Sequence, residues 1–267
     1  HDILSVFQTI DLCDSLSFEE IAAGHTEVVC SDPALPVGPE NLAYQAVEAL
    51  REATGFGRGV RVFLTKRIPA EAGLGGGSAD AAAVLRVLNN AWGVGMSDGH
   101  LREMAAGIGS DVPFLLRSGT AVASGRGEVL RYVPWSSEVR YVLVHPPFTV
   151  STEWAYRRAS ERISLALTGR SKYVNFLGSI ADSPICAHDL FACVENDFEA
   201  VVAEAWPVLC DIRRALQETG ADVCCLTGSG SVMYGAFFDV AAANRAAASL
   251  RQEGHRVFLC RPLIVGR

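Results

Sequence analysis

The sequence lacks an uninterrupted apolar run long enough to cross a bilayer, although 49% of its 267 residues are hydrophobic. A membrane-spanning helix needs about 20 consecutive apolar residues. The first residues also lack the charged and apolar regions of a signal peptide. Neither a membrane partner nor export is therefore expected, and we predict a cytoplasmic protein whose length suits one large domain or two smaller ones.

Metal-binding and disulfide patterns are missing as well. The eight cysteines contain no C-x-x-C pair, and the six histidines do not cluster near them. Structural zinc sites and disulfide frameworks depend on such spacings. We interpret the cysteines as reduced, mostly buried side chains, in agreement with a cytoplasmic location.

Positive charge is scarce. The formal net charge is −7, and Lys66 and Lys172 are the only lysines among 23 basic residues. Because nucleic acids and anionic membranes attract a basic face, neither is expected as a partner. An anionic ligand of this protein would have to be held by backbone amides and a few cations.

The most informative stretch is a glycine-rich loop that opens a helix. Four of the five residues 73–77 are glycines, and a run rich in alanine and leucine begins at Ser78. Val84, Leu88 and Trp92 lie four residues apart, as on one face of a helix. Because glycine has no Cβ, its N–H groups can approach an anion, and the first turn of a helix attracts phosphate. The stretch predicts a phosphate site, because a simple turn needs fewer glycines.

Two common phosphate loops do not fit this stretch. The P-loop of nucleoside triphosphatases has a lysine after its last glycine, whereas Ser78 follows Gly77. A dinucleotide-binding loop directly follows a strand, whereas several residues separate the predicted strand 60–64 from Gly73. Neither class of enzyme is favoured.

Three motifs, in this order, resemble those of the GHMP small-molecule kinases. They are Lys66-Arg67-Ile68-Pro69 with Ala72-Gly73-Leu74-Gly75-Gly76-Gly77-Ser78-Ala79-Asp80, then Gly109-Ser110-Asp111-Val112-Pro113-Phe114, and then Gly228-Ser229-Gly230. The triple glycine resembles the branch that phosphorylates 4-diphosphocytidyl-2-C-methylerythritol (CDP-methylerythritol). Homoserine and mevalonate kinases usually have Gly-Leu-Gly-Ser-Ser instead.

The resemblance implies an α+β, two-domain GHMP kinase fold. An N-terminal ATP-binding domain, residues 1–136, would resemble domain 2 of ribosomal protein S5, and a C-terminal domain, residues 137–267, would be ferredoxin-like. We place the boundary at the polar turn 134–137. Alternating apolar residues predict strands at 15–20, 26–30, 59–66, 119–124, 127–133, 141–146 and 257–260, and helical spacing predicts helices at 41–50, 78–92, 101–108 and 240–252.

The resemblance also implies an ATP site, with Mg²⁺ as the accompanying ion. Asn41 and Lys66 would contribute to it, although Asn41 is also placed to cap a helix and Lys66 could equally be solvated. Spacing identifies no metal ligands, and Ser78 is a candidate. The loop residues expected to bind ATP are Pro69, Ala70, Glu71, Ala72, Gly73, Leu74, Gly75, Gly76, Gly77, Ser78 and Ala79.

Asp111 is the expected catalytic residue. Its position before Pro113 also suits the cap of a short helix. By the resemblance, its carboxylate faces the hydroxyl that receives the phosphoryl group, a role that asks for a base within hydrogen-bond reach.

On the acceptor side, the resemblance implies that Thr152 lines the pocket and that Tyr156 stacks on the cytosine ring. A helix cap and a buried core tyrosine are the alternatives for these two residues. Gly228, Ser229 and Gly230 would form a turn that packs against the cleft near Asp111 and the phosphates. Asn196 and Glu199 have the spacing of a capping box and are left out of the site.

His1 resembles the histidine of the family's Gly-Tyr-His and is expected to line the substrate pocket. The family's preceding strand, with an Ala-Lys-x-Asn-Leu motif that carries the catalytic lysine, has no counterpart in the sequence. We expect that such a segment precedes His1 in the natural protein, because a sheet without its opening strand would expose an unpaired edge.

Taken together, these features predict an ATP-dependent kinase of CDP-methylerythritol, acting in non-mevalonate isoprenoid synthesis as a monomer or homodimer. Another GHMP kinase, acting on homoserine, mevalonate or a sugar, is the first alternative. The second is a nucleotide-binding module without turnover, because the lysine is missing.

Overall fold

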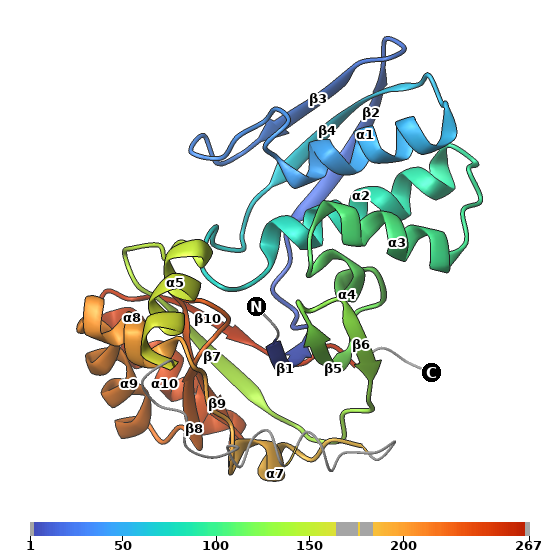
Figure 1. Ribbon diagram of the computed structural model, residues 1–267. Helices are drawn as coiled ribbons and strands as arrows, with labels where there is room; N and C mark the ends of the chain where they lie inside the picture. The colour runs from blue at the N-terminus through green and yellow to red at the C-terminus, as the bar shows by residue number, and fades with distance from the viewer. Residues whose placement is uncertain (1–2, 164–175, 177–183, 265–267) are drawn as a thin grey trace.

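The computed structural model describes residues 3–163, 176 and 184–264, and within these residues the strands form three sheets (Figure 1). The first sheet has the order β2-β4-β3, with β2 antiparallel and β3 parallel to β4. Helices α1, α2 and α3 lie on one side of it (Figure 1). The bounds are β2 Ser15–Ile21, β3 Thr26–Cys30, β4 Gly59–Thr65, α1 Leu42–Thr54, α2 Gly76–Ala91 and α3 Asp98–Ile108.

Local sequence signals account for these elements. In β4, Val60, Val62 and Leu64 are buried whereas Phe63 faces solvent, as a half-buried strand requires. The side chain of Asn41 accepts a hydrogen bond from the N–H of Ala43 at 2.8 Å, so the predicted cap is confirmed.

The second sheet is antiparallel, in the order β1-β5-β6. It contains the predicted hairpin that turns near Arg126, and the short helix α4 precedes it in the chain. Its elements are β1 Ile3–Gln8, β5 Thr120–Gly125 and β6 Val129–Tyr132, and α4 spans Val112–Arg117.

The third sheet is antiparallel, in the order β10-β7-β9-β8. Helices follow β7 and β9, which gives the expected ferredoxin-like β-α-β-β-α-β order. The strands are β7 Arg140–His145, β8 Val223–Leu226, β9 Met233–Phe237 and β10 Arg256–Cys260. The helices are α5 Thr152–Ile163, α7 Ala187–Phe191, α8 Glu199–Ala205, α9 Val208–Glu218 and α10 Val240–Gln252.

One hydrophobic cluster joins the second and third sheets. It combines Val122 of β5 with Tyr141 of β7 and Cys260 of β10. Trp135, in the turn where we place the domain boundary, is buried in the same cluster. The boundary therefore stays a prediction, and the two halves share apolar contacts along it. No helix within the described residues has the length and apolar character that a membrane crossing requires.

Candidate functional site

The glycine loop enters α2 through left-handed backbone. Gly73 and Gly75 have φ angles of +74° and +63°, and Gly75 is the N-cap residue of α2. The helix begins at Gly76, two residues earlier than the composition predicted, because the left-handed Gly75 turns the chain directly into it. No side chain caps this terminus. The N–H groups of its first turn therefore have no side-chain acceptor and are suited to bind phosphate.

The turn between β8 and β9 lies against this loop. The hydroxyl of Thr227 donates to the carbonyl of Gly73 at 3.0 Å, and the N–H of Val232 donates to the carbonyl of Ala72 at 3.2 Å. A Cβ on Gly228 would lie 3.1 Å from the Gly73 carbonyl oxygen. The Gly228-Ser229-Gly230 turn thus contacts the glycine loop through the backbone, and its role beside the phosphates stays a prediction.

Asn196 and Glu199 hold this turn in place, and only half of the predicted capping box forms: Asn196 accepts the N–H of Phe198 at 2.9 Å, but Glu199 does not reach back to Asn196. The Asn196 amide donates to the carbonyls of Leu226 and Gly228, both at 2.8 Å. Glu199 accepts the N–H of Leu226 at 3.0 Å and pairs with Arg213. Glu199 begins α8 and points to β8 instead of back to Asn196. The same spacing can serve either role, and only the position of β8 decides between them.

Asp111 faces the glycine loop. It occupies the N-cap position of α4, as predicted from Pro113, but its side chain makes no capping hydrogen bond and is left for another role. One of its carboxylate oxygens lies 3.9 Å from the point that a Cβ would occupy on Gly75. Burial raises the pKa of the Asp111 carboxyl above its ordinary value. The site therefore combines a carboxylate of increased basicity with a loop suited to phosphate.

Thr152 and Tyr156 approach the same region from α5. The hydroxyl of Ser151 accepts the N–H of Trp154 at 3.4 Å and caps the helix. Thr152 is therefore free of the capping role, and its hydroxyl lies 3.1 Å from that of Ser229. The structure thus brings the start of α5 next to the Gly228-Ser229-Gly230 turn, although Thr152 and Ser229 lie 77 positions apart in the sequence.

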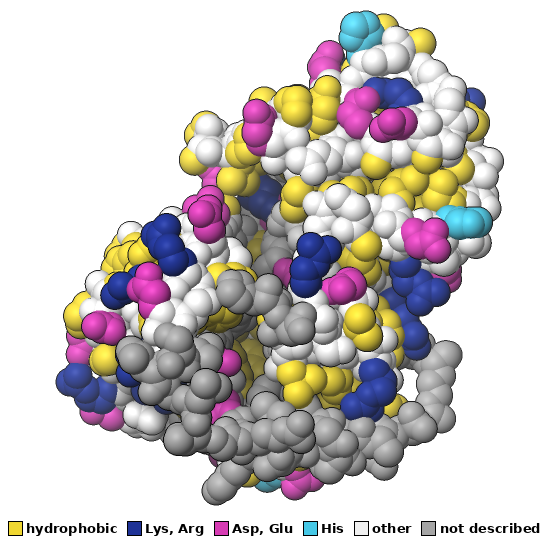
Figure 2. Space-filling view, in the orientation of Figure 1, with side chains coloured by type: hydrophobic (Ala, Val, Ile, Leu, Met, Phe, Trp, Pro, Cys, Tyr) yellow, Lys and Arg dark blue, Asp and Glu magenta, His cyan; other side chains and the backbone are white. Residues whose placement is uncertain are grey.

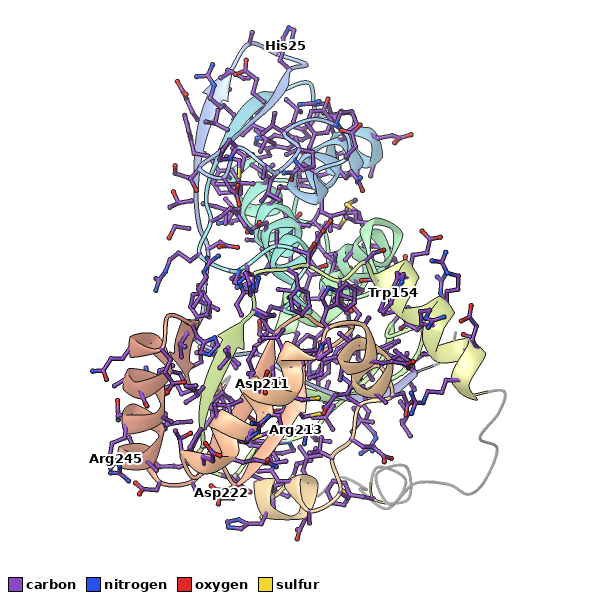
Figure 3. The ribbon with its side chains drawn as sticks, turned by 90° about the vertical axis from the view of Figure 1, so that its left-hand side faces the viewer. His25, Trp154, Asp211, Arg213, Asp222 and Arg245 are labelled. Carbon is purple, nitrogen blue, oxygen red and sulfur yellow. The ribbon has the colours of Figure 1, made fainter. Side chains whose placement is uncertain are left out.

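Tyr156 is half-buried, with its ring edge-to-face against Phe198 at 4.8 Å between centroids. Burial raises the pKa of the Tyr156 hydroxyl, and the negative charge of Asp111 adds to this effect. The phenol therefore lies near the carboxylate instead of deep in a core. Trp154, labelled in Figure 3, anchors the start of α5 by edge-to-face packing on Trp206 at 4.9 Å.

A cavity of about 650 Å³ opens beside these residues. Ser110 lines it from the turn before α4, Arg126 from the β5–β6 turn, and Tyr156 and Arg157 from α5. In Figure 2 a furrow separates the lobe that carries α5 from the rest of the molecule. The cavity is large enough for a nucleotide-sized ligand.

Lys66 lies beneath the glycine loop in a buried ion-pair cluster. Its ammonium donates to Asp14 at 2.5 Å and to Asp80 at 2.7 Å, and its side chain is only 7% exposed. The solvated alternative for Lys66 was therefore wrong. The ammonium lies 3.5 Å from the point that a Cβ would occupy on Gly76, so it supports the first turn of α2.

The two aspartates of this cluster differ in their environment. Asp14 also accepts the N–H groups of Arg67 and Ile68. Burial raises the pKa of Asp80 to about 6, although Lys66 acts against the rise. One Asp80 oxygen has no hydrogen-bond partner among the described residues. The sequence analysis missed Asp14, because no motif marks an aspartate that lies 52 positions from its lysine.

Asn41 lies at the edge of the site. It caps α1, and the next residue, Leu42, places a methyl group 3.5 Å from the point that a Cβ would occupy on Gly77. The capping role and proximity to the loop are therefore compatible. His1 lies outside the described residues. Within those residues, no group of three or more histidine, cysteine or acidic side chains has the geometry of a metal site.

The chain is similar to known proteins over almost its whole length. The family described as GHMP kinases N terminal domain matches residues 41–119, and the family described as GHMP kinases C terminal matches residues 187–256. A 4-diphosphocytidyl-2-C-methyl-D-erythritol kinase of Pelotomaculum thermopropionicum is 39% identical over 261 residues, covering 98% of this chain and 89% of the relative. The enzyme of that name from Gloeobacter violaceus is 38% identical over 264 residues, covering 98% and 86%.

Solved structures extend the comparison. A crystal structure of 4-(cytidine 5'-diphospho)-2C-methyl-D-erythritol kinase is 30% identical, with a TM-score of 0.77 and coverage of 100% of this chain and 91% of the other. A homoserine kinase from Cytophaga hutchinsonii is 17% identical, with a TM-score of 0.67 and coverage of 97% and 89%. At that identity the similarity concerns the fold alone.

Proposed function

The chain belongs to the 4-diphosphocytidyl-2-C-methyl-D-erythritol kinases of the GHMP family, and on this basis we propose that it transfers the γ-phosphoryl group of ATP to the 2-hydroxyl of CDP-methylerythritol. This reaction is a step of non-mevalonate isoprenoid precursor synthesis. The observation that carries the proposal is the position of Asp111, whose half-buried side chain makes no capping hydrogen bond and faces the glycine loop.

The glycine loop would hold the phosphates of ATP. Its amides at the start of α2 have no side-chain cap, and the helix dipole favours an anion there. Lys66 would support the loop, because Asp14 and Asp80 hold its ammonium next to the first turn of α2. Asn41 and Leu42 would lie on the base side of the nucleotide, next to Gly77. Phosphoryl transfer depends mainly on such positioning and on charge neutralisation.

Asp111 would accept the proton of the acceptor hydroxyl. Its pKa is raised by burial, which brings its basicity closer to what proton transfer at neutral pH requires. Thr152 and Tyr156 would hold the acceptor from α5, Thr152 beside Ser229 and Tyr156 beside Asp111. An aromatic face suits a pyrimidine ring. His1 would complete this pocket, as the resemblance implies.

Mg²⁺ would accompany the ATP phosphates. Magnesium usually keeps several waters and takes only one or two protein ligands beside the phosphates. Ser78 fits that mode, because its hydroxyl lies in the first turn of α2, next to the amides that would hold the phosphates. When bound, the ion would neutralise charge on the transferred group.

A coupled ADP-release assay tests the proposal. Wild-type protein is expected to turn over CDP-methylerythritol and to leave homoserine and mevalonate unreacted, and Asp111→Ala is expected to lose most of the activity. Asp211→Ala is the control, because Asp211, labelled in Figure 3, lies on α9 and forms only an exposed ion pair with Arg214. Comparable turnover in Asp111→Ala and wild type would remove Asp111 from its role.

The proposal includes a cytoplasmic enzyme that acts as a monomer or a homodimer. All eight cysteines are free thiols, and Cys224, Cys225 and Cys260 are buried. Reduced cysteines are the rule in a reducing compartment. Size-exclusion chromatography with light scattering would decide the oligomeric state.

A further inference from the structure

Two arginines line the cavity beside Asp111 from different elements. Arg126 comes from the β5–β6 turn and Arg157 from α5, directly after Tyr156. Among the described residues that line the cavity, they are the basic ones. Both side chains are exposed to solvent and therefore accessible to a ligand.

Neither arginine is committed to an ion pair within the described part of the chain. The two arginines that follow on α5 are committed: Arg158 pairs with Glu161 at 3.0 Å and Arg162 with Glu204 at 3.4 Å. Glu128, next to Arg126 in the turn, accepts the backbone N–H of Arg126 and not its side chain. Two guanidinium groups thus remain available, and each can bind a phosphate with two parallel hydrogen bonds.

Two acidic residues, Glu153 and Glu161, also line the cavity, so the formal charge of its lining is balanced. Glu161 is paired with Arg158, and Glu128 lies beside Arg126 in the turn. An anion is therefore favoured by two guanidinium groups that have no ion pair within the described residues, and not by a net positive charge.

The positions of Tyr156 and Asp111 indicate which anion would fit. If the pyrimidine lies on Tyr156 and the reacting hydroxyl at Asp111, the part of the acceptor that joins them must occupy the cavity between. In a nucleoside diphosphate ester that part is a diphosphate, with one negative charge on each phosphate. On the proposed function, the amides of the glycine loop would bind the phosphates of ATP and would not be available to this second diphosphate.

We propose that Arg126 and Arg157 bind the diphosphate bridge of the acceptor and thereby select alcohols that carry a nucleoside diphosphate over uncharged ones. The inference rests on the proposed function and extends it to the source of acceptor specificity. The two side chains approach the bridge from opposite halves of the chain, so the acceptor would also join the β5–β6 turn to α5.

Calorimetric measurement of CDP and cytidine binding tests the role of Arg126 and Arg157, and it does not depend on turnover. With the ATP site filled by a non-hydrolysable ATP analogue, wild-type protein is expected to bind CDP more tightly than cytidine. Arg126→Ala and Arg157→Ala are each expected to reduce this preference roughly tenfold or more, as for a lost charge-assisted hydrogen bond. The KM for ATP should stay unchanged, while the KM for CDP-methylerythritol should rise.

Arg162→Ala is the matched control, because Arg162 lies on the same helix, is ion-paired and does not line the cavity. Arg126→Lys and Arg157→Lys should keep part of the preference for CDP over cytidine. Lysine retains the positive charge but lacks the planar guanidinium that forms two parallel hydrogen bonds. Thermal melts would confirm that each variant folds.

The inference is overturned if both alanine variants keep the full preference for CDP over cytidine, or if Arg162→Ala loses as much as they do. A wild-type enzyme that fails to phosphorylate CDP-methylerythritol would refute the proposed function instead. The two failures are distinguishable, because the comparison of CDP with cytidine needs no chemical step.

Discussion

Thr227 and Gly73 lie 154 positions apart in the sequence, and both the hydroxyl and the carbonyl group of Thr227 lie against the backbone of Gly73. The carbonyl oxygen of Thr227 is 2.0 Å from the point that a Cβ would occupy on Gly73, and the Thr227 hydroxyl donates to the Gly73 carbonyl at 3.0 Å. Glycine is therefore required at position 73 for two reasons, the left-handed backbone and the close approach of another chain segment. The contact ties the candidate phosphate loop to the C-terminal half.

Gly73→Ala is expected to destabilise the protein by about 2–4 kcal/mol, because strain from the positive φ adds to the clash with Thr227. The KM for ATP should rise as the loop shifts. Gly93→Ala is the control: Gly93 has a similar φ of +67° and open space around it. It should show the strain alone, about 1–2 kcal/mol. Equal losses in urea unfolding for both variants would contradict the role of the Thr227 contact.

Asp111→Asn should separate activity from stability. We expect kcat to fall by roughly 10²–10⁴-fold, the usual contribution of a general base. Because burial raises the pKa of Asp111 in the folded state, ionisation of this carboxyl opposes folding at neutral pH. The variant should therefore be as stable as wild type or more stable. A variant that melts well below wild type at pH 7 would show that the carboxylate stabilises the fold.

The Lys66 cluster predicts a pH effect on stability. The pKa of Asp80 is about 6 in the folded protein, above its ordinary value of 3.8. The folded state then binds the proton more tightly than the unfolded state does, so this group's contribution to stability is present at low pH and declines as the pH rises from about 4 through 6. Asp80→Asn mimics the protonated form, so the difference in unfolding free energy between the variant and wild type should shift in favour of the variant across this window.

Urea unfolding of wild type and Asp80→Asn between pH 4 and pH 8 measures the effect of Asp80. Parallel pH profiles of the two proteins would rule it out. Asp14→Asn provides a comparison, because Asp14 additionally accepts the N–H groups of Arg67 and Ile68. Its loss should cost stability throughout the range, by about 1–3 kcal/mol, since the bonds from one exposed and one partly buried N–H group weaken.

Ser151 and Thr152 are neighbours with different expected roles. Ser151→Ala removes the cap of α5 and should cost about 1 kcal/mol of stability, with little change in kinetics. Thr152→Val keeps the shape of the side chain and removes its contact with Ser229. We expect a higher KM for the acceptor and an unchanged KM for ATP. The reverse assignment, with kinetics altered only in Ser151→Ala, would show that Thr152 does not line the acceptor pocket.

The sequence by itself determined the local structure. The apolar alternation of 59–66 predicted β4, Asn41 predicted the start of α1, and the glycine run predicted a phosphate-suited helix start at α2. These signals depend on period and capping chemistry, which act within a few residues. The order of three motifs was enough to indicate the family, because motif order is a property of the chain alone.

Only the tertiary structure decided which side chains meet. Asn196 and Glu199 had the spacing of a cap, yet they bind β8 and its turn, because that strand brings its backbone groups within reach. Lys66 had no partner in its own segment and found Asp14 and Asp80 in others. A hydrogen bond between distant residues depends on how the elements pack, and local periodicity carries no information about that packing.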